Sequence, residues 1–329
     1  MLAFETLKEQ IFSITNEDSF NSVALELFEL HKKENPIYRK FVLSLPESFH
    51  NATHYSKIPF LPISFFKSHK ILLEKQETKT IFKSSATTGS IQSLHYVPDP
   101  DWYLENSLRI FKHFYGNIND YCILALLPSY LEREGSSLIY MAKELIAQSH
   151  HERSGFYLDD HALLKRQLED LKKQEQKTIL LGVSFALVEF SEKYSIDFPE
   201  LIVMETGGMK GRRKEMIRDE LHAILKAGFG VPSIHSEYGM TELFSQAYSK
   251  KDGLFSLPPW MKIMIRDAND PFALLKDEEA GGINIIDLAN IYSCPFIATQ
   301  DLGKHHADAF EILGRFDNSD IRGCNLLVV

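Results

Sequence analysis

The chain of 329 residues has little cysteine, no excess of basic residues and no long apolar run. Its three cysteines are too few and too scattered for a disulfide framework or a zinc site, which favours a reducing compartment. A formal charge of −9 argues against a general nucleic-acid binder. No stretch approaches the ~20 apolar residues that span a bilayer, and the first residues lack the pattern of a signal peptide. These absences predict a cytoplasmic protein with no nucleic-acid partner and no membrane span.

Short apolar runs alternate with helix-like segments through the middle of the chain. Runs typical of buried strands occupy residues 121–129, 177–184, 200–208 and 231–239. Segments with helical character lie between them, at residues 135–150, 185–194 and 212–225. This alternation predicts an α/β fold whose strands are mostly parallel, with helices on the faces of the sheet.

The two ends of the chain differ from this middle part. Apolar residues recur at helical spacing over residues 16–35, where Asn16 or Asp18 offers an N-cap and Asn35-Pro36 a stop. The last third is richer in turns and alternating residues, which predicts a smaller β subdomain. We therefore expect a helical N-terminal segment at 1–80, an α/β core at 81–250 and a β subdomain at 251–329 that ends in a mobile tail.

A cluster of hydroxyl residues, "SSATTGS", separates two strand-like segments. Its backbone amides and hydroxyls are suited to holding phosphate oxygens. It is not a Walker A loop, because the Gly-Lys-Ser/Thr ending is absent. An ordinary surface loop is the alternative. The candidate residues are Ser84, Ser85, Thr87, Thr88 and Gly89.

The stretch "EYGMTE" follows the last apolar run of the middle part. The ring of Tyr238 offers a flat face to a base, the Thr241 hydroxyl can meet a phosphate, and Glu242 can bind Mg²⁺, which prefers oxygen ligands. The alternative is a helix start with Thr241 or Glu242 near the cap. Gly239 and Met240 lie within the same stretch.

Two further features lie at predicted turns. Gly207-Gly208 follows an apolar run, where glycine lets the backbone approach a planar ligand closely. Asp301 can accept hydrogen bonds from the two hydroxyls of a ribose. Arg315 can neutralise a phosphate or contact the same hydroxyls. Taken singly, each of these is more typical of an ordinary turn.

The order of these motifs resembles that of the adenylate-forming superfamily of acyl and aryl ligases. The resemblance covers residues 84 to 323 through "SSATTG", "GG", "YGMTE", "DLG" and "GRFDNSDIRG". It implies that the loop at 84–89 holds the phosphates of ATP. It also implies that Gly207, Gly208 and Tyr238 enclose adenine, with Gly239 and Met240 beside them. Thr241 and Glu242 would then meet the α-phosphate and Mg²⁺, while Asp301 and Arg315 hold the ribose.

The chain departs from the family pattern in three places. Ala86 stands where the family loop usually has glycine, and Ser90-Ile91 follows Gly89 where a lysine is usual. The sequence also stops after "GRFDNSDIRG", where typical members continue for about a hundred residues, an ordinary small-domain length. That further domain carries a catalytic lysine and the coenzyme A tunnel, so we expect poor coenzyme A ligation.

Other segments resemble acyl-protein synthetases of the LuxE type, namely "IPFLPISFFKS", "LALLPSYLEREGSSLIYMAKELI", "TGGMKGRR" and "DIRGCNLL". The resemblance implies that Cys324 carries the acyl group as a thioester and passes it to a partner such as a fatty acid reductase. A packing cysteine on an apolar terminal strand is the alternative for Cys324. Arg133 and Ser136 are candidates for contact with the acid's carboxylate, while Cys122 and Cys294 are expected in the core.

The sequence thus predicts an ATP- and Mg²⁺-dependent enzyme that activates a carboxylic acid, expected to be a fatty acid, as acyl-AMP. Two alternatives remain open. One is a coenzyme A or carrier-protein ligase completed by a separate domain, and the other is a non-catalytic adenylate-binding subunit.

Overall fold

The computed structural model describes residues 2–85, 91–128, 134–158, 160–207 and 216–316. The chain divides into two compact units. Residues 1–76 together with 259–329 form unit 1, and residues 77–258 form unit 2. Each unit is described by itself.

Unit 2 is built on a mixed sheet whose central strands are parallel. Its strand order is β10-β9-β8-β7-β6-β4-β5, and only β8–β9 and β9–β10 pair antiparallel. Every residue of β4 and β6 is buried, as expected for strands covered on both faces. The strands are β4 (Cys122–Leu126), β5 (Gly155–Phe156), β6 (Thr178–Val183), β7 (Ile202–Thr206), β8 (His235–Tyr238), β9 (Ala247–Ser249) and β10 (Leu254–Ser256).

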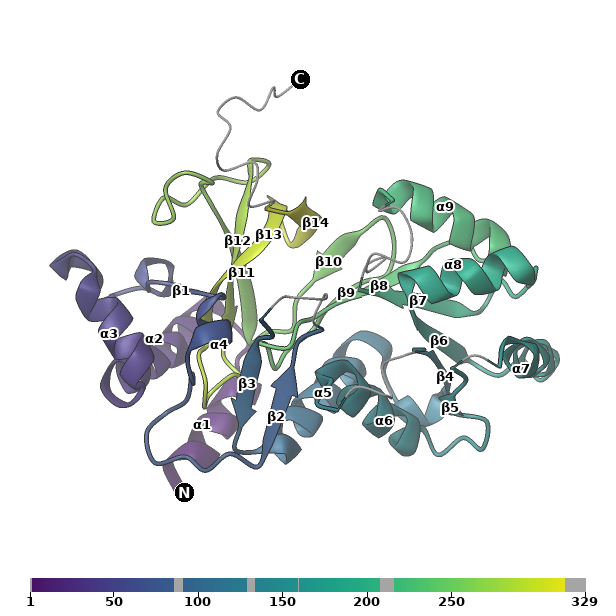
Figure 1. Cartoon of the computed structure of the whole chain (residues 1–329), viewed down its shortest axis with the longest axis horizontal. Coiled ribbons are helices and arrows are strands. Elements are labelled where there is room, and N and C mark those ends of the chain that lie inside the picture. The colour runs from purple at the N-terminus through teal and green to yellow at the C-terminus, as the bar shows by residue number, and fades with distance from the viewer. Residues whose placement is uncertain (1, 86–90, 129–133, 159, 208–215, 317–329) are drawn as a thin grey trace. The chain divides into compact units, whose positions relative to one another are not determined.

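Helices cover both faces of this sheet (Figure 1). On one face, the rings of Phe190 in α8 and Phe229 in α9 stack with centroids 5.7 Å apart. On the other face, the Tyr103 hydroxyl in α5 donates to the Ser137 carbonyl at the start of α6. The helices of unit 2 are α5 (Pro100–Tyr115), η3 (Ile118–Asp120), α6 (Ser137–Ser149), α7 (His161–Lys173), α8 (Ser184–Lys193) and α9 (Arg218–Phe229).

A separate antiparallel hairpin precedes α5. It consists of β2 (Thr80–Lys83) and β3 (Leu94–Val97), paired from Thr80 with Val97 to Lys83 with Leu94. The strand-like segments predicted on either side of the hydroxyl cluster are therefore the two arms of one hairpin.

Unit 1 contains an antiparallel sheet of strands β11 to β14, and β1 pairs parallel with β13. β11 alternates buried and half-buried residues, and its buried side chains Met261, Ile263 and Ile265 face the core. The strands are β1 (Leu61–Pro62), β11 (Met261–Arg266), β12 (Ala280–Asp287), β13 (Phe296–His306) and β14 (Ala309–Arg315).

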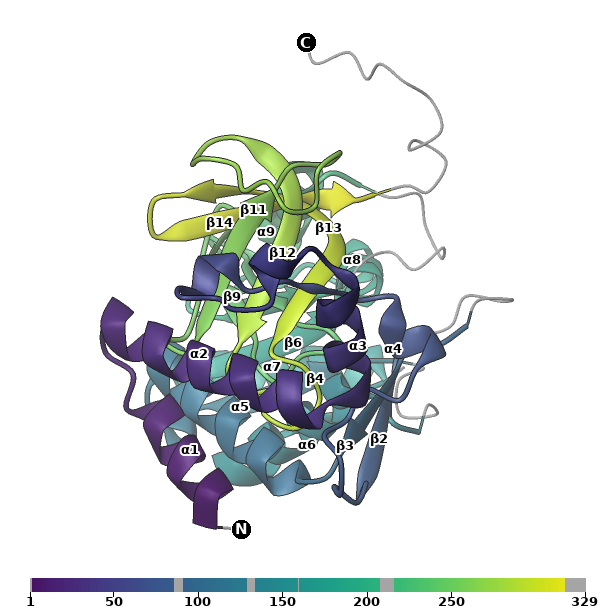
Figure 2. The same cartoon turned by 90° about the vertical axis from the view of Figure 1, so that its left-hand side faces the viewer.

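Helices pack on this second sheet, and Figure 2 shows α2 crossing β12 and β13. The rings of Phe28 in α2 and Phe296 in β13 meet edge to face, 6.5 Å apart. A capping box at Asn16 begins α2, and Asn35 both ends α2 and caps α3. The helices are α1 (Leu2–Phe12), α2 (Glu17–Glu34), α3 (Pro36–Ser44), η1 (Glu47–Phe49), η2 (Tyr55–Lys57) and α4 (Phe65–Ser68).

The predicted α/β fold class is confirmed. Each of the four apolar runs contains a buried strand of the unit 2 sheet, and the predicted helices between them are α6, α8 and α9. The last third forms the expected β structure. In the part of the chain that the structure describes, no helix has the length and apolar character to cross a bilayer.

Candidate active site

The parallel strands of unit 2 bring several predicted site residues to one edge of the sheet. Strands β4, β6, β7 and β8 run in the same direction, so their carboxyl ends meet at the same edge. Ser136 follows β4, Gly207 follows β7, and Tyr238 ends β8. In open α/β sheets, ligands bind outside the carboxyl ends of the strands.

The hairpin that bears the hydroxyl cluster is tied to the same edge. The Lys83 amide donates to the Gly135 carbonyl over 2.7 Å, next to Ser136. Ser84 closes the neck of the hairpin loop, because its hydroxyl accepts from the Ser93 amide. Ser85 is exposed. Ser136 is the N-cap of α6, and its hydroxyl accepts from the amide three residues on.

The segment from residue 239 to residue 246, which we call the 239–246 turn, connects β8 to β9. The helix start offered as the alternative for Thr241 and Glu242 is wrong, because the chain enters the antiparallel strand β9 within these few residues. Thr241 is partly exposed, whereas Glu242 is buried. The Thr241 carbonyl meets Nδ1 of His95, on β3, at 2.7 Å.

Two buried amide side chains, one from α5 and one from the turn itself, hold the turn by hydrogen bonds. Asn106 in α5 and Gln246 both donate to the Phe244 carbonyl, over 2.9 and 3.1 Å. Asn106 Oδ1 and Gln246 Oε1 are buried and have no hydrogen-bond partner among the described residues. Such unpaired acceptors are uncommon in folded proteins and are costly.

Gly239 lies directly over two polar side chains. A Cβ placed on Gly239 would lie 2.5 Å from Glu237 Oε1 and 3.3 Å from Gln246 Cγ. A side chain at this position would force the buried Glu237 carboxylate to shift, so glycine fits here without a rearrangement. We call Thr206, Glu237 and Gln246, together with Asn106, the Glu237 cluster.

Glu237 itself is a buried acid on β8. The Thr206 hydroxyl on the neighbouring strand donates to its Oε2. Burial raises the pKa of Glu237 to about 7, and the Thr206 hydrogen bond lowers it while the nearby Glu205 raises it further. The same acid helps to raise the pKa of Tyr248, which burial already raises.

Gly207 sits at the end of β7 with φ of +66°, a conformation that favours glycine. The Ser184 hydroxyl at the start of α8 lies 2.6 Å from the Gly207 carbonyl and 2.9 Å from Glu205 Oε2. Nε2 of His222 in α9 lies 3.8 Å from the other oxygen of Glu205. This buried network fixes the end of β7, where adenine is expected to bind.

The ring of Tyr238 packs edge to face on Phe255, with centroids 5.9 Å apart and planes inclined by 62°. The guanidinium of Arg218 covers the same Phe255 ring at 5.2 Å. Tyr238 is only partly buried. Its aromatic face is thus held in place by packing, as a base-binding ring requires.

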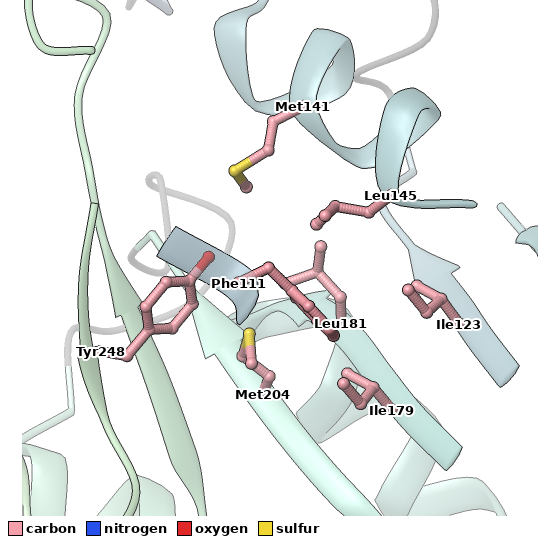
Figure 3. Close-up of a pocket in the computed structure, with 8 residues that line it drawn as sticks. All are labelled: Phe111, Ile123, Met141, Leu145, Ile179, Leu181, Met204 and Tyr248. Atoms are coloured by element: carbon pink, nitrogen blue, oxygen red, sulfur yellow. The ribbon is translucent and has the colours of Figure 1, made fainter. Parts of the chain in front are cut away.

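A small apolar cavity lies on the α5/α6 face of the same sheet (Figure 3). Its volume, about 10 Å³ for the centre of a water-sized sphere, is room for about one water molecule. Tyr248, opposite Glu237 in the β8–β9 pairing, forms one wall. In this conformation the cavity is too small for an acyl chain and is a packing gap of the core. Its lining consists of Phe111, Ile123, Met141, Leu145, Ile179, Leu181, Met204 and Tyr248.

Unit 1 holds the other two described candidates, and they form a pair. Asp301 on β13 and Arg315 on β14 are direct partners in the strand pairing, and Arg315 Nε donates to Asp301 Oδ1 over 3.0 Å. The Asp301 side chain is 9% exposed and that of Arg315 is 73% exposed. Arg266 faces the same aspartate, and its guanidinium donates to the carbonyl of Thr299 over 2.6 Å.

Six candidates lie outside the described residues. They are Thr87, Thr88, Gly89, Arg133, Gly208 and Cys324. The other two cysteines are buried core residues, as predicted. Burial raises the pKa of the Cys122 thiol to about 11 and that of Cys294 to about 12, so both are poor nucleophiles at neutral pH.

The described residues suit Mg²⁺ bound together with a nucleotide. Among them no group of three or more acidic, histidine or cysteine side chains could by itself hold a metal ion. Mg²⁺ commonly binds through one or two carboxylates plus the phosphates of a substrate. Glu242, a single carboxylate at the carboxyl edge, is compatible with that mode.

Comparison with known proteins establishes the fold. MatB from Rhodopseudomonas palustris, solved with ATP bound, is 17% identical with a TM-score of 0.53, covering 73% of this chain and 48% of its own. An open conformation of 2-hydroxyisobutyryl-CoA ligase with 2-HIB-AMP and CoA is 11% identical with a TM-score of 0.64, covering 93% and 77%. The same ligase in the postadenylation state is 12% identical with a TM-score of 0.63, covering 92% and 68%.

The chain spans about half the length of the MatB structures. No family model matches the chain, and neither does any curated protein. At these identities the likeness concerns the fold, so the chain has the α/β fold of adenylate-forming ligases.

Proposed function

We propose that this protein is an ATP-dependent acyl-protein synthetase of the adenylate-forming type. It activates a carboxylic acid, in our proposal a fatty acid, as acyl-AMP and captures the acyl group on Cys324. The observation that carries the proposal is the convergence of three motifs at one sheet edge of unit 2. Hydrogen bonds link the hairpin that bears Ser84 to Gly135 and to Thr241 in the 239–246 turn. Gly207 directly follows β7, the strand that pairs with β8.

Each motif has a role in nucleotide binding under this proposal. The loop at 84–89 holds the phosphates, and Tyr238 with Gly207 and Gly208 encloses adenine. Thr241 approaches the α-phosphate, and Asp301 with Arg315 holds the ribose. The Asp301–Arg315 ion pair supports the last role, because it holds the guanidinium directly beside the carboxylate that would accept from the ribose hydroxyls. Gly239 and Met240 complete the wall beside the base.

The reaction has two half-reactions. A carboxylate oxygen of the acid attacks the α-phosphorus of ATP, forming a new P–O bond while pyrophosphate leaves. The Cys324 thiolate then attacks the acyl carbon of the mixed anhydride, and AMP leaves with the bonding electrons. When bound by Glu242 and the phosphates, Mg²⁺ would supply positive charge that offsets the negative charge on the phosphate oxygens. Arg133 and Ser136 orient the acid's carboxylate, and a partner thiol, such as that of a fatty acid reductase, accepts the acyl group.

Coenzyme A ligation is the second candidate. The likeness in fold to 2-hydroxyisobutyryl-CoA ligase, solved with CoA, favours it. In that case CoA, rather than Cys324, receives the acyl group. The identity of 11% leaves the acceptor open, so the thiol must be found by experiment.

Intact-protein mass after incubation with Mg²⁺, ATP and a panel of fatty and aromatic acids tests the proposal. We expect an added acyl mass that hydroxylamine removes and that Cys324→Ser never shows. Cys122→Ala is the matched control, because that thiol is buried with its pKa raised to about 11, and it should acylate normally. Cys324→Ser should retain ATP–pyrophosphate exchange.

Other outcomes would replace the proposal. Pyrophosphate released only when CoA is added, and unaffected by Cys324→Ser, would assign a CoA ligase. ATP binding with no pyrophosphate release for any acid or thiol would leave a non-catalytic adenylate-binding subunit.

A further inference from the structure

His95 joins two parts of the candidate site that lie far apart in the sequence. It is in β3, the second arm of the hairpin that carries the hydroxyl cluster, and it is completely buried. Its Nδ1 meets the Thr241 carbonyl, 146 residues further along the chain, at 2.7 Å. Because a carbonyl oxygen can only accept, Nδ1 carries the proton and donates it.

Aromatic packing holds the imidazole ring in this position. The ring of Phe244, in the 239–246 turn, lies 5.2 Å away at an angle of 40°. The ring of Phe82, on β2, approaches edge-on at 6.4 Å. The imidazole therefore has little freedom to rotate, and its donor stays directed at Thr241.

The hydrogen bond acts on the peptide group between Thr241 and Glu242. A fixed carbonyl at Thr241 fixes the plane of that peptide, and with it the positions of the amide nitrogen and Cα of Glu242 from which the side chain starts. Asn106 holds the turn two residues later through the Phe244 carbonyl. Glu242 is buried directly after this peptide group, so a rotation of the peptide would have to be accommodated in a packed environment.

We propose that His95 is a positioning residue that couples the phosphate-binding hairpin to the Mg²⁺-binding carboxylate of Glu242. The inference rests on the proposed function, because that function gives the hairpin and Glu242 their ligands. Losing the His95 donor frees the Thr241–Glu242 peptide to rotate. ATP is then still bound, but Mg²⁺ no longer strengthens its binding.

Two substitutions at His95 separate the hydrogen bond from packing. His95→Phe keeps a planar ring between Phe82 and Phe244 but removes the donor. His95→Asn places an amide N–H near the position of Nδ1 and restores the donor. His31→Phe is the matched control, since it removes another fully buried histidine that contacts a carbonyl, here Ile291 of unit 1, at 2.9 Å.

The measurement is calorimetric affinity for ATP with Mg²⁺ and with EDTA in place of Mg²⁺. We expect Mg²⁺ to tighten ATP binding at least tenfold in the wild type and His31→Phe, and less than threefold in His95→Phe. The affinity without Mg²⁺ should be unchanged, and His95→Asn should recover most of the Mg²⁺ effect. In ATP–pyrophosphate exchange, His95→Phe should need at least tenfold more Mg²⁺, with the KM for the acid unchanged.

The outcomes separate this inference from the function it rests on. A His95→Phe protein with the full Mg²⁺ effect overturns the positioning role and leaves the proposed function intact. Equal losses in His95→Phe and His95→Asn, with or without Mg²⁺, assign His95 to packing and overturn the inference as well. A wild type that binds no ATP overturns both.

Discussion

The two units each bury a cluster of polar side chains, and the clusters differ in how completely they are hydrogen-bonded. In unit 1, Asn35 donates to the Ser293 carbonyl over 2.6 Å, and its oxygen accepts from two amides at the start of α3. Nε2 of His31 meets the Ile291 carbonyl, while its Nδ1 lies 3.3 Å from the Asn35 amide nitrogen. We call His31, Asn35, Asn290 and Ser293 the Asn35 cluster.

The Glu237 cluster of unit 2 is built differently. It combines an acid whose pKa is raised to about 7 by burial with two amides whose oxygens lack partners among the described residues. A fully paired polar cluster specifies a fold, whereas unpaired groups and shifted acids gather at sites that bind something. Under the proposed function, the comparison predicts a structural role for the Asn35 cluster and a role near the bound nucleotide for the Glu237 cluster.

The comparison can be tested in each unit separately, because each contains one of the two tryptophans of the chain. Trp260 lies in unit 1 and Trp102 in unit 2, and both are buried. The variant Trp102→Phe leaves a fluorescence signal from unit 1, and Trp260→Phe leaves one from unit 2. Unfolding by urea can then be followed for each cluster in its own unit.

The largest effect is expected for Asn35→Ala. It removes the N-cap of α3 and leaves the Ser293 carbonyl buried without its donor. Loss of a cap and of a buried partner together cost about 4 kcal/mol in the free energy of unfolding. The fluorescence of Trp260 should report this loss of stability. Under conditions in which the variant is fully folded, its affinity for ATP should be unchanged. A loss below about 1 kcal/mol would contradict the structural role.

Acid should weaken the Asn35 cluster through His31. Burial lowers the pKa of His31 to about 3, from 6.5 when unfolded, so the folded state resists protonation. The contribution of neutral His31 to the free energy of unfolding is fully present above pH 6.5 and is lost as the pH falls towards 3. Between pH 6.5 and pH 4 the loss is about 3 kcal/mol in the free energy of unfolding.

His31→Gln should remove this dependence, because an amide can still meet the Ile291 carbonyl but does not titrate. The check is the free energy of unfolding of unit 1 at several pH values, wild type against variant. If the free energy of unfolding falls with pH equally in the wild type and in His31→Gln, His31 is not responsible for the acid sensitivity.

A rise in pH, rather than a fall, should lower the stability that the Glu237 cluster gives to unit 2. The folded-state pKa of Glu237 is raised from 4.5 to about 7 by burial, so its contribution is present below pH 4.5 and is lost as the pH rises through 7. From pH 5 to pH 8 the loss is about 2 kcal/mol. Glu237→Gln keeps an acceptor for the Thr206 hydroxyl and should show no such loss when followed by Trp102. If the variant loses stability as the wild type does, the opposite pH responses of the two clusters have another source.

Local patterns predicted most of the fold. Asn16 and Asn35 were recognisable as boundaries of α2 because capping depends on residues within one turn of each other. The buried strands were visible as apolar runs, since parallel strands are covered on both faces. The helix considered for Thr241 and Glu242 failed because the 239–246 turn depends on Asn106, which no local pattern relates to it.

The site was predictable only where it is made of consecutive residues. The motifs for which we propose nucleotide binding are short and can be recognised in the sequence, and the structure pairs Asp301 with Arg315. His95 and Glu237 were missed because their partners, a turn residue and a residue of the neighbouring strand, lie 146 and 31 residues away in the sequence. One signal was available: a glutamate directly before Tyr238, in a segment expected to be a buried strand, is costly unless it has a role.

The smallest effect on stability, and the most selective test, concerns Gln246. Gln246→Met loses a hydrogen bond to the Phe244 carbonyl, which Asn106 still satisfies, and it removes a buried oxygen without a partner. The net change in the free energy of unfolding should be below about 1 kcal/mol. Under the proposed function, ATP–pyrophosphate exchange should nevertheless fall at least fivefold, because the substitution removes the unpaired amide oxygen of a side chain that packs against Gly239.

The matched control is Asn290→Leu in unit 1. Asn290 donates to the Cys294 carbonyl over 3.0 Å and accepts from the Ser293 hydroxyl over 2.6 Å, so its replacement removes both of these buried hydrogen bonds. We expect about 3 kcal/mol of destabilisation and unchanged exchange per folded molecule. If Gln246→Met instead destabilises as much as Asn290→Leu and leaves exchange intact, its oxygen is paired in solution. The Glu237 cluster would then be as structural as the Asn35 cluster, and the difference between the units would lie in pKa alone.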